Sequence, residues 1–550
     1  MNMNKHLDLA NRSNNSAGAI AAIGQDVHQE YLLDSVIPKI NAQKHRERLC
    51  HIHDLEFYDL TYNCIGVHVS DMVKNANLPF RRMLRQLQRS IVALTNRQSG
   101  GIGFINFDQE AAAFLRDESD EELIEVFHEF YLDLNMFTRK GCEKPYVTLN
   151  FGLDTSKNAR RISFAMLEAF QQGGEKGAPF IFPNHVFKLS KDVNQRETSP
   201  NHDLYLRSLA VTAKRMIPTY YNCDSVANHK LNATDIGVMG CRTRMGTNVN
   251  GKDGAFNRGN VTCVTLNLPQ MAYHAKGNKD AFYEELMQNL VDARELLLHH
   301  YHLLCNQADF HDCFREGYYM GAEQHDNEAM LKNGSLSIGF IGLWDAIQLL
   351  HGETFTSVDD LRAYYEEALS IVKAMNRFTE ETTRTTKLNF SLLASAAEGV
   401  TGKFAKYDSE HAGKGNVMSE KGFYTNSFHV PVNIPVSYRA KAEIEGPFHK
   451  LCNGGSITYV EFKEMPSRNI AAVQEVIDYA CSQDCNYIGI NFQMDYCDDC
   501  GYTGRLDDEC PCCHGHHIKH LRRVSGYLAE ESTFASGKKA EMKKRISHIG

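Results

Sequence analysis

Two cysteine pairs near the carboxyl end of the chain have the spacing of a metal site. Cys497 and Cys500 form one Cys-x-x-Cys pair, Cys510 and Cys513 close the second, and residues 501–509 separate the two. Four thiolates at such spacing form a tetrahedral Zn²⁺ site that leaves the metal no open position. The spacing therefore predicts a structural Cys₄ zinc ribbon that serves folding rather than chemistry. The alternative is four free or disulfide-paired cysteines.

Two further residues, Cys241 and Gly526, are of chemical interest because of their surroundings. Cys241 lies in residues 239–243 (Met-Gly-Cys-Arg-Thr), a glycine-containing segment without helical periodicity. Gly526 follows the ribbon in residues 522–528 (Arg-Arg-Val-Ser-Gly-Tyr-Leu), where the lack of a side chain lets the backbone approach another group closely. Considered alone, Cys241 is better explained as a buried structural thiol and Gly526 as a turn residue.

The segments that must position these residues predict an α/β architecture. Residues 1–25, rich in Asn, Ser, Ala and Gly, predict a flexible lead-in, and residues 26–140 show helical periodicity with an apolar stripe along 80–94. From 141 to 345, short β-rich runs alternate with helices, which is typical of an enclosed sheet. Strands are predicted at 179–183, 261–268 and 454–461, and helices at 282–305, 344–350 and 356–385.

Length and composition exclude several classes of protein. A chain of 550 residues is too long for one small core, so we expect a large catalytic domain with an appendage. A net charge of −9 argues against a nucleic-acid-binding protein. The sequence contains no run of about 18 uncharged apolar residues that would cross a membrane. Its 16 cysteines, without an export signal, favour thiols and metal ligands over disulfides and predict a cytoplasmic protein.

The segments that carry candidate chemistry resemble those of one family, the anaerobic (class III) ribonucleoside-triphosphate reductases. The Arg-Val-x-Gly-Tyr tail at 523–527 is similar to the glycyl radical segment of that family, although many members carry Cys where Ser525 stands. The resemblance covers about residues 25 to 550. The segments that carry it, in the same order, are 51–54 (His-Ile-His-Asp), 63–64 (Asn-Cys), 239–243, 258–262 (Arg-Gly-Asn-Val-Thr), 265–269 (Thr-Leu-Asn-Leu-Pro), 335–340 (Ser-Leu-Ser-Ile-Gly-Phe) and 424–427 (Tyr-Thr-Asn-Ser).

The resemblance implies a fold and a domain organisation. It implies a ten-stranded α/β barrel at 26–490, with an N-terminal helical part and a dimer interface, then the zinc ribbon at 491–520 and a glycyl radical segment at 521–550. A loop inside the barrel would carry Cys241, and the C-terminal segment would bring Gly526 alongside, shielded from water and oxygen. Many members carry an ATP-binding regulatory domain in front, for which residues 1–25 leave no room.

The resemblance also implies roles in radical chemistry. A separate activase with a [4Fe–4S] cluster and S-adenosylmethionine would remove a hydrogen atom from Gly526, since a side chain would obstruct a planar Cα radical. This glycyl radical would take hydrogen from Cys241, and the resulting thiyl radical would abstract the 3′-hydrogen of the ribose. Cys64 is the candidate proton and hydrogen donor on the opposite face of the sugar, with Asn63 and His51 as polar neighbours.

The residue two positions before Cys241 bears on the source of electrons. Family members either oxidise formate to CO₂ or use a second active-site cysteine with a thioredoxin- or glutaredoxin-like donor. Here that position is Met239 rather than cysteine, which resembles the formate-using pattern. Cys263 and Cys452 keep the thiol-dependent alternative open.

Binding of a ribonucleoside triphosphate is assigned to polar side chains in the shared segments. Amides at a helix start bind anions well, and the strand at 335–340 leads into such a helix at 344–350. The family's effector site for deoxynucleoside triphosphates or ATP, at the interface of a homodimer, is expected within the helices near 70–110. The candidate substrate-binding residues are His51, His53, Asn260, Ser335, Ser337, Thr425, Asn426 and Ser427.

Two other functions compete with this interpretation. Another glycyl radical enzyme, of the lyase type, would usually lack a ribbon directly before the radical glycine, and formate-lyases use two adjacent cysteines in mid-chain. The adjacent pair in this sequence is Cys512-Cys513, inside the predicted ribbon. A zinc-stabilised binding or scaffold protein is the alternative without catalysis, and it predicts that no radical ever forms.

Overall fold

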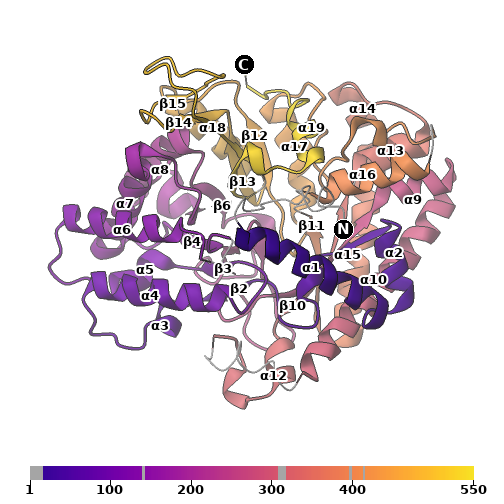
Figure 1. The fold of residues 1–550 in the computed structure, drawn as a ribbon, viewed down its shortest axis with the longest axis horizontal. Coiled ribbons are helices and arrows are strands. Elements are labelled where there is room, and N and C mark those ends of the chain that lie inside the picture. Colours follow the sequence, from indigo (N-terminus) through magenta and orange to yellow (C-terminus); the bar gives the residue numbers. More distant parts are fainter. Residues whose placement is uncertain are drawn as a thin grey trace.

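A computed structural model describes residues 16–138, 143–307, 318–395, 399–412, 415–524 and 526–549. It shows the mixed α/β fold that the sequence predicts. In Figure 1 the helices of the first part of the chain, α4 to α8, lie on one side of the molecule, and α9, α13 and α16 lie on the other. Residues 1–15 of the predicted lead-in, and Ser525, lie outside the described residues.

The second part of the predicted lead-in is helical. Residues 16–25 belong to α1 (Ser16–Ser35), whose Ala-rich first turns favour a helix. Further along α1, the side chain of Gln29 donates to Glu56 at 2.9 Å, and His28 Nδ1 contacts the Glu56 carbonyl oxygen at 2.9 Å. The structure thus gives residues 16–25 a helical conformation, while the flexibility of the lead-in stays a prediction.

The larger sheet has seven strands in the order β12-β13-β6-β5-β4-β3-β2. Strands β2 to β6 run parallel, β13 pairs antiparallel with β6, and β12 runs parallel to β13. The strands are β2 (Ile65–Val67), β3 (Ile102–Phe104), β4 (Val147–Phe151), β5 (Asn184–Leu189), β6 (Thr219–Asn222), β12 (Thr458–Glu461) and β13 (Tyr487–Asn491).

The smaller sheet has four strands in the order β1-β9-β10-β11. β9 (Asn260–Asn267), β10 (Ser335–Ile341) and β11 (Asn389–Ala394) are parallel, and β1 (Cys50–Ile52) pairs antiparallel with β9. Every residue of β9 and β10 is buried, as expected for parallel strands covered on both faces. The strand predicted at 261–268 is therefore confirmed as β9, which begins and ends one residue earlier than predicted.

Single bridges lie at the two seams between these sheets. Gly66 of β2 bridges to Arg258 just before β9, and Leu393 of β11 bridges to Gly455 just before β12. The strands β2 to β6 and β9 to β13 make ten, the number that the predicted barrel requires. Closure of that barrel stays a prediction, because the seams carry bridges rather than ladders.

Amphipathic helices cover the sheets. The predicted stripe along α4 (Phe80–Thr95) is confirmed, since Phe80, Met83, Leu84, Leu87, Ile91 and Leu94 are all buried. The long helix predicted at 282–305 is α10 (Lys279–Cys305). The remaining α-helices are α2 (Lys39–Arg46), α3 (Val69–Met72), α5 (Phe107–Ala112), α6 (Asp120–Leu134), α7 (Lys157–Gln172), α8 (His202–Arg215), α9 (Leu268–Ala275), α12 (Asn327–Leu331), α13 (Leu343–His351), α14 (Val358–Ala363), α15 (Tyr365–Thr386), α16 (Val400–His411), α17 (Tyr438–His449) and α18 (Ile470–Ser482).

The predicted strand at 179–183 is wrong. Those residues are irregular, and β5 begins only after Pro183, at Asn184. A proline at each end of the segment removes backbone donors from any ladder, so the apolar run packs as a loop instead.

The C-terminal part of the chain forms an antiparallel sheet of its own. Its strands, in the order β15-β14-β16-β17, carry both the predicted ribbon and the predicted radical segment, and α19 (Ser536–Met542) follows. In Figure 1 these yellow elements lie at the top. The strands are β14 (Met494–Cys497), β15 (Thr503–Gly504), β16 (Ile518–Arg523) and β17 (Leu528–Glu530). Within the described ranges, no helix combines the length and the apolar character needed to cross a membrane.

Candidate active site

Cys241 lies at the tip of a short hairpin formed by β7 (Val238–Met239) and β8 (Thr243–Arg244). Two side chains of β4 hold this hairpin. Asn150 donates to the carbonyl of Val238 at 2.9 Å and accepts from its amide at 2.8 Å, and Thr148 donates to the carbonyl of Gly240 at 3.2 Å. Gly240 has a φ of +61°, which residues with side chains rarely adopt. The glycine before Cys241 thus allows the sharp turn at the tip.

Gly526 lies at the tip of a second hairpin, between β16 and β17. The amide of Val524 donates to the carbonyl of Tyr527 at 3.0 Å and closes this turn. A Cβ atom added to Gly526 would lie 2.6 Å from the carbonyl carbon of Cys241 and 2.7 Å from its Cα. The backbones of the two tips therefore touch, and the contact leaves no room for any side chain at residue 526.

Aromatic rings enclose this contact. The ring of Tyr527 lies 5.3 Å from that of Tyr146, which in turn lies 4.9 Å from Phe182. Val524 and the partly buried Cys241 belong to the same apolar cluster. Such packing excludes water from a reactive centre. Sequence reasoning missed Tyr146 and Phe182, because nothing in their local pattern marks them as neighbours of the tail.

Cys64 lies against the Cys241 hairpin. A Cβ atom on Gly240 would be 3.2 Å from the Cys64 sulfur. The Cys64 thiol donates to Asn63 Oδ1 at 2.8 Å and accepts from the Gly101 amide at 3.2 Å. Burial raises the pKa of Cys64 to about 12, so the group stays a thiol at neutral pH. Cys64 thus keeps its hydrogen beside the residue that is predicted to form the thiyl radical.

Asp54 supports the Cys64 side of the site. Its carboxylate accepts from the side-chain amide of Asn63, and Ser99 Oγ donates to it at 3.0 Å. The amide of Asn63 therefore presents its oxygen to the thiol of Cys64. Asp54 lies in the segment 51–54 that carries the resemblance, but neither it nor Ser99 was assigned a role from the sequence.

Met239 is fully buried in a small apolar cluster with Cys64. A Cβ atom on Gly103 would lie 2.7 Å from the Cβ of Met239, so the strand β3 passes directly beside the hairpin. The thioether therefore lines the same region of the interior as the two cysteines.

The half-buried rings of His51 and His53 meet edge-to-face, with ring centroids 4.9 Å apart. His53 shares a hydrogen bond of 2.7 Å with the Thr265 hydroxyl, which lies 2.6 Å from the hydroxyl of Ser395. Burial lowers the pKa of both imidazoles, so both are neutral at physiological pH. Neutral rings suit a hydroxyl-bearing ligand better than a phosphate.

The structure brings Asn260, Ser335 and Ser337 together where β9 and β10 begin. The side-chain amide of Asn260 donates to the hydroxyls of Ser337 at 2.8 Å and Ser335 at 3.1 Å. All three residues are buried. They form one polar cluster at the start of two neighbouring parallel strands.

The segment 425–427 contacts the start of α13. The amides of Gly342 and Leu343 donate to the carbonyls of Thr425 and Ser427, at 2.8 and 3.2 Å. These two amides therefore bind protein carbonyls rather than an anion. The hydroxyls of Thr425 and Ser427 are buried without a partner among the described residues, and they remain available to a ligand.

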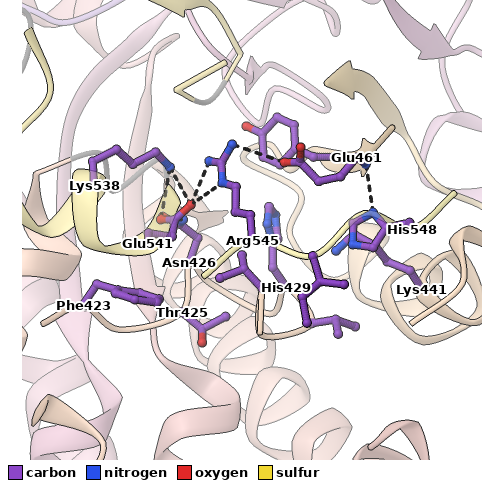
Figure 2. A pocket seen from close by; sticks show the side chains of 14 residues that line it. Phe423, Thr425, Asn426, His429, Lys441, Glu461, Lys538, Glu541, Arg545 and His548 are labelled. Atoms are coloured by element: carbon purple, nitrogen blue, oxygen red, sulfur yellow. Dashed lines mark hydrogen bonds and ion pairs between the residues drawn. The ribbon is translucent and has the colours of Figure 1, made fainter. Parts of the chain in front are cut away.

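Asn426 faces a different pocket, which is formed with the C-terminal tail. Its side chain donates to Glu541 at 3.4 Å, as Figure 2 shows. Glu541 also pairs with Lys538 at 3.0 Å and with Arg545 at 2.8 Å, and Arg545 pairs with Glu461 at 3.2 Å. This buried ionic network docks α19 on the main domain.

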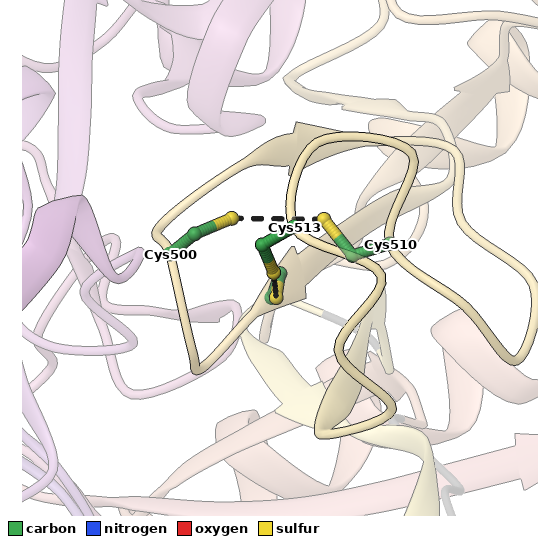
Figure 3. A group of neighbouring side chains, drawn as sticks. Cys500, Cys510 and Cys513 are labelled. Atoms are coloured by element: carbon green, nitrogen blue, oxygen red, sulfur yellow. Dashed lines mark hydrogen bonds between the residues drawn. The ribbon is translucent and has the colours of Figure 1, made fainter.

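The four predicted metal ligands, Cys497, Cys500, Cys510 and Cys513, form one cluster whose sulfur atoms lie within 4.8 Å of one another. Figure 3 shows Cys500, Cys510 and Cys513 converging on a common centre. Two sulfur pairs, 497–513 and 500–510, are each 3.6 Å apart. A Zn–S distance of about 2.3 Å gives tetrahedral edges of about 3.8 Å, so the cluster fits Zn²⁺.

The fold is shared with anaerobic ribonucleotide reductases. A crystal structure of the enzyme from Thermotoga maritima in complex with dATP and CTP superposes with a TM-score of 0.73, at 16% sequence identity. The match covers 96% of this chain and 92% of that one. This likeness confirms the predicted fold class.

Sequence comparisons place the chain more narrowly. The family model described as anaerobic ribonucleoside-triphosphate reductase matches residues 8–548. The enzyme of that name from Salmonella typhimurium is 28% identical over 95% of this chain and 80% of its own length. The one from Enterobacteria phage T4 is 25% identical over 98% of this chain and 97% of its own. The chain belongs to the anaerobic ribonucleoside-triphosphate reductases, a family of glycyl radical oxidoreductases.

Proposed function

We propose that this chain reduces ribonucleoside triphosphates to 2′-deoxyribonucleoside triphosphates, storing a radical on Gly526 and using it through Cys241. The contact between the backbones of these two residues is the observation that carries the proposal. The overall reaction is NTP + HCO₂⁻ + H⁺ → dNTP + CO₂ + H₂O. The two electrons that replace the 2′-hydroxyl by hydrogen come from the C–H bond of formate.

Activation requires a second protein. A radical activase that contains a [4Fe–4S] cluster and uses S-adenosylmethionine removes one hydrogen atom from the α-carbon of Gly526. The planar radical is stabilised between the amide nitrogen and the carbonyl of the glycine. The rings of Tyr146, Phe182 and Tyr527 then shield it from solvent.

In each turnover the glycyl radical takes the hydrogen atom of the Cys241 thiol. The Cys241 thiyl abstracts the 3′-hydrogen of the ribose, which weakens the 2′ C–O bond. Cys64 protonates the departing 2′-hydroxyl, which leaves as water, and regains a proton from the 3′-hydroxyl as a 3′-ketone forms. Formate then supplies a hydrogen atom to C2′ and an electron to the ketone, which also takes up the proton of the overall reaction, and CO₂ leaves. The Cys64 thiol is protonated at neutral pH because burial raises its pKa, and Asn63 orients it. The 3′-hydrogen returns from Cys241 at the end, and the radical returns to Gly526.

Formate is the proposed reductant because a methionine, Met239, occupies the position where a thiol-dependent enzyme would carry a second cysteine. Met239 is buried beside Cys64. The thiol-dependent alternative would use Cys263 or Cys452, both of which are buried. Burial raises the pKa of each thiol and so disfavours the thiolate that disulfide exchange requires.

The ribonucleotide is proposed to bind between two groups of polar side chains, one in the segment 425–427 and the other at the start of β9 and β10. Thr425 and Ser427 offer hydroxyls to the phosphates, while Asn260 and the serines beside it, with His51 and His53, face the sugar. Asn426 contacts Glu541 of the tail, so a substrate contact by its side chain would compete with that hydrogen bond. We expect deoxynucleotide or ATP effectors to bind near α4, at the interface of a homodimer.

Zn²⁺ would be held by Cys497, Cys500, Cys510 and Cys513, and it would supply folding energy rather than chemistry. The ribbon shares strands β14 and β16 with the hairpin that carries Gly526. The metal would therefore support the position of the radical residue. Thiolate ligands persist in a reducing compartment, and we place the enzyme in the cytoplasm.

The test is an anaerobic assay with the activase, S-adenosylmethionine and a ribonucleoside triphosphate, with and without formate. We expect one CO₂ for each deoxynucleotide. Absence of a deoxynucleotide with any reductant would contradict the proposed function. Product with thioredoxin but not with formate would support the thiol-dependent alternative.

A further inference from the structure

Three arginines are buried around the Cys241 hairpin, and two of them are fully engaged with the protein. Arg244 is 5% exposed and Arg258 is fully buried. Each uses all three guanidinium nitrogens as donors to protein oxygens. The acceptors for Arg244 are Tyr221 Oη, Asn228 Oδ1 and the carbonyls of Ala227 and Asn453; those for Arg258 are the carbonyls of Gly246, Thr247, Gly254 and Asn333.

Arg242, directly after Cys241, differs from both. It is 2% exposed, yet its Nε and Nη2 donors have no partner among the described residues. Across the same described ranges no carboxylate lies within the 4.0 Å of an ion pair with it. An unpaired buried cation is costly, because it has lost water without gaining an acceptor. Such a group calls for an anionic ligand.

The two unpartnered donors lie on one edge of the guanidinium. That edge presents parallel N–H bonds that match the two oxygens of a carboxylate. The chain itself provides an example: Nε and Nη2 of Arg207 donate to the two carboxylate oxygens of Glu168 at 2.6 and 2.7 Å. The same edge of Arg242 is therefore shaped for a carboxylate.

The surroundings of Arg242 contain neutral groups. Burial lowers the pKa of His429, and the charges of Lys441 and Arg242 lower it further. Burial raises the pKa of the Cys452 thiol, against the opposing effect of Arg242. Lys441 is itself paired with Glu445. Within the described part of this region, Arg242 is thus the cation with free donors that could bind a small anion beside Cys241.

We propose that the Nε/Nη2 edge of Arg242 binds the carboxylate of formate next to Cys241. This inference rests on the proposed function and names the binding site of its reductant. When both formate oxygens accept from one guanidinium edge, the C–H bond points directly away from it. The bond that must break is then unobstructed. Oxidation to CO₂ removes the negative charge, so the product loses the ion pair and leaves.

The test compares Arg242→Lys with the wild type under anaerobic, activated conditions. Lysine keeps the charge but loses the bidentate edge. We expect the KM for formate to rise about tenfold to a hundredfold, the change that loss of a charge-assisted hydrogen bond produces. The KM for the nucleotide should change less than about twofold, and the glycyl radical signal should keep its intensity. Thr425→Ala should do the reverse, raising the nucleotide KM alone.

A second measurement does not depend on turnover. Broadening of the ¹³C resonance of labelled formate by unactivated enzyme should be present in the wild type and lost in Arg242→Gln, with unchanged thermal unfolding as the control for folding. Equal formate binding in both proteins, or a higher KM for the nucleotide instead of formate, would overturn the inference; the second result would assign Arg242 to substrate phosphate. Wild-type activity that is independent of formate would instead refute the formate step of the proposed function.

Discussion

The two hairpins that meet at Cys241 and Gly526 are held in different ways. In β7–β8, side-chain hydrogen bonds reach the tip itself, through Asn150 and Thr148. In β16–β17, a side-chain hydrogen bond lies at the base, where Arg523 donates to the carbonyl of Ile490 at 3.0 Å. Nearer the tip, the described contacts include its own turn bond and packing against aromatic rings.

This difference separates two kinds of fixation. Hydrogen bonds from buried side chains define the position of a backbone, and breaking them leaves unsatisfied groups. The glycine hairpin depends instead on apolar contacts and on the sheet that it shares with the ribbon. We therefore expect damage near β4 to affect the use of the radical, and damage to the ribbon to affect its formation.

The largest effect is expected for Cys241→Ser. A serine O–H bond is much stronger than a thiol S–H bond, so the glycyl radical cannot take its hydrogen. The variant should form the radical at wild-type yield and make no detectable deoxynucleotide. Electron paramagnetic resonance and a product assay on the same sample separate the two steps. Any product would remove Cys241 from its proposed role.

The ribbon variant Cys500→Ser should lose Zn²⁺ and most of its radical yield, by about tenfold or more, because a structural zinc site contributes folding energy directly. Cys512→Ser is the matched control, since Cys512 is exposed and lies outside the four-sulfur cluster. Zinc content and spin yield are the measurements. A zinc-free enzyme with full radical yield would show that the ribbon does not support Gly526.

Asn150→Ala tests the β7–β8 hairpin that carries Cys241. It removes two buried hydrogen bonds to Val238 and one to Phe104, which should cost about 1–3 kcal/mol of stability. Misplacement of Cys241 should lower kcat about tenfold while the spin yield stays constant. The exposed Asn77→Ala is the control. A loss of radical yield equal to the loss of kcat would contradict separate fixation of the two hairpins.

The smallest effect on activity is expected at the tail. Burial raises the pKa of Glu541, but Lys538 and Arg545 lower it more, to about 2. A carboxyl with a depressed pKa stabilises the folded state above its unfolded pKa, here about 4.5, and loses that contribution as pH falls toward 2. Glu541→Gln should thus make α19 more sensitive to proteolysis at neutral pH and abolish this pH dependence. Equal cleavage of both proteins at pH 7 would exclude a docking role.

The parts of the fold and site that could be predicted from the sequence are those with local signals. Cys-x-x-Cys spacing marks all four cysteines of the cluster, and 3.6-residue periodicity marks the buried face of α4. The apolar run at 180–182 favours a strand, but the prolines at 179 and 183 disfavour one, and the structure shows that the prolines decide the outcome. The resemblance also predicts that Cys64, Cys241 and Gly526 lie close together, and in the described part of the structure they do.

The other features of the site depend on contacts between distant segments. Asn150 binds Val238 across 88 residues, and Tyr146 meets Tyr527 at the far end of the chain. No local pattern records such pairings. Arg242 was visible as part of the Met-Gly-Cys-Arg-Thr segment, but its significance lies in missing partners, which only three-dimensional packing reveals.

The most direct test of the central claim is to locate the radical. Activated enzyme should give a doublet in electron paramagnetic resonance, and exposure to air should then cut the chain at Gly526, as mass spectrometry would show. Gly526→Ala should give neither result, whereas Gly24→Ala, where an added Cβ meets nothing within 4 Å, should give both. A doublet that persists in Gly526→Ala, or a wild-type chain that stays intact in air, would contradict the account.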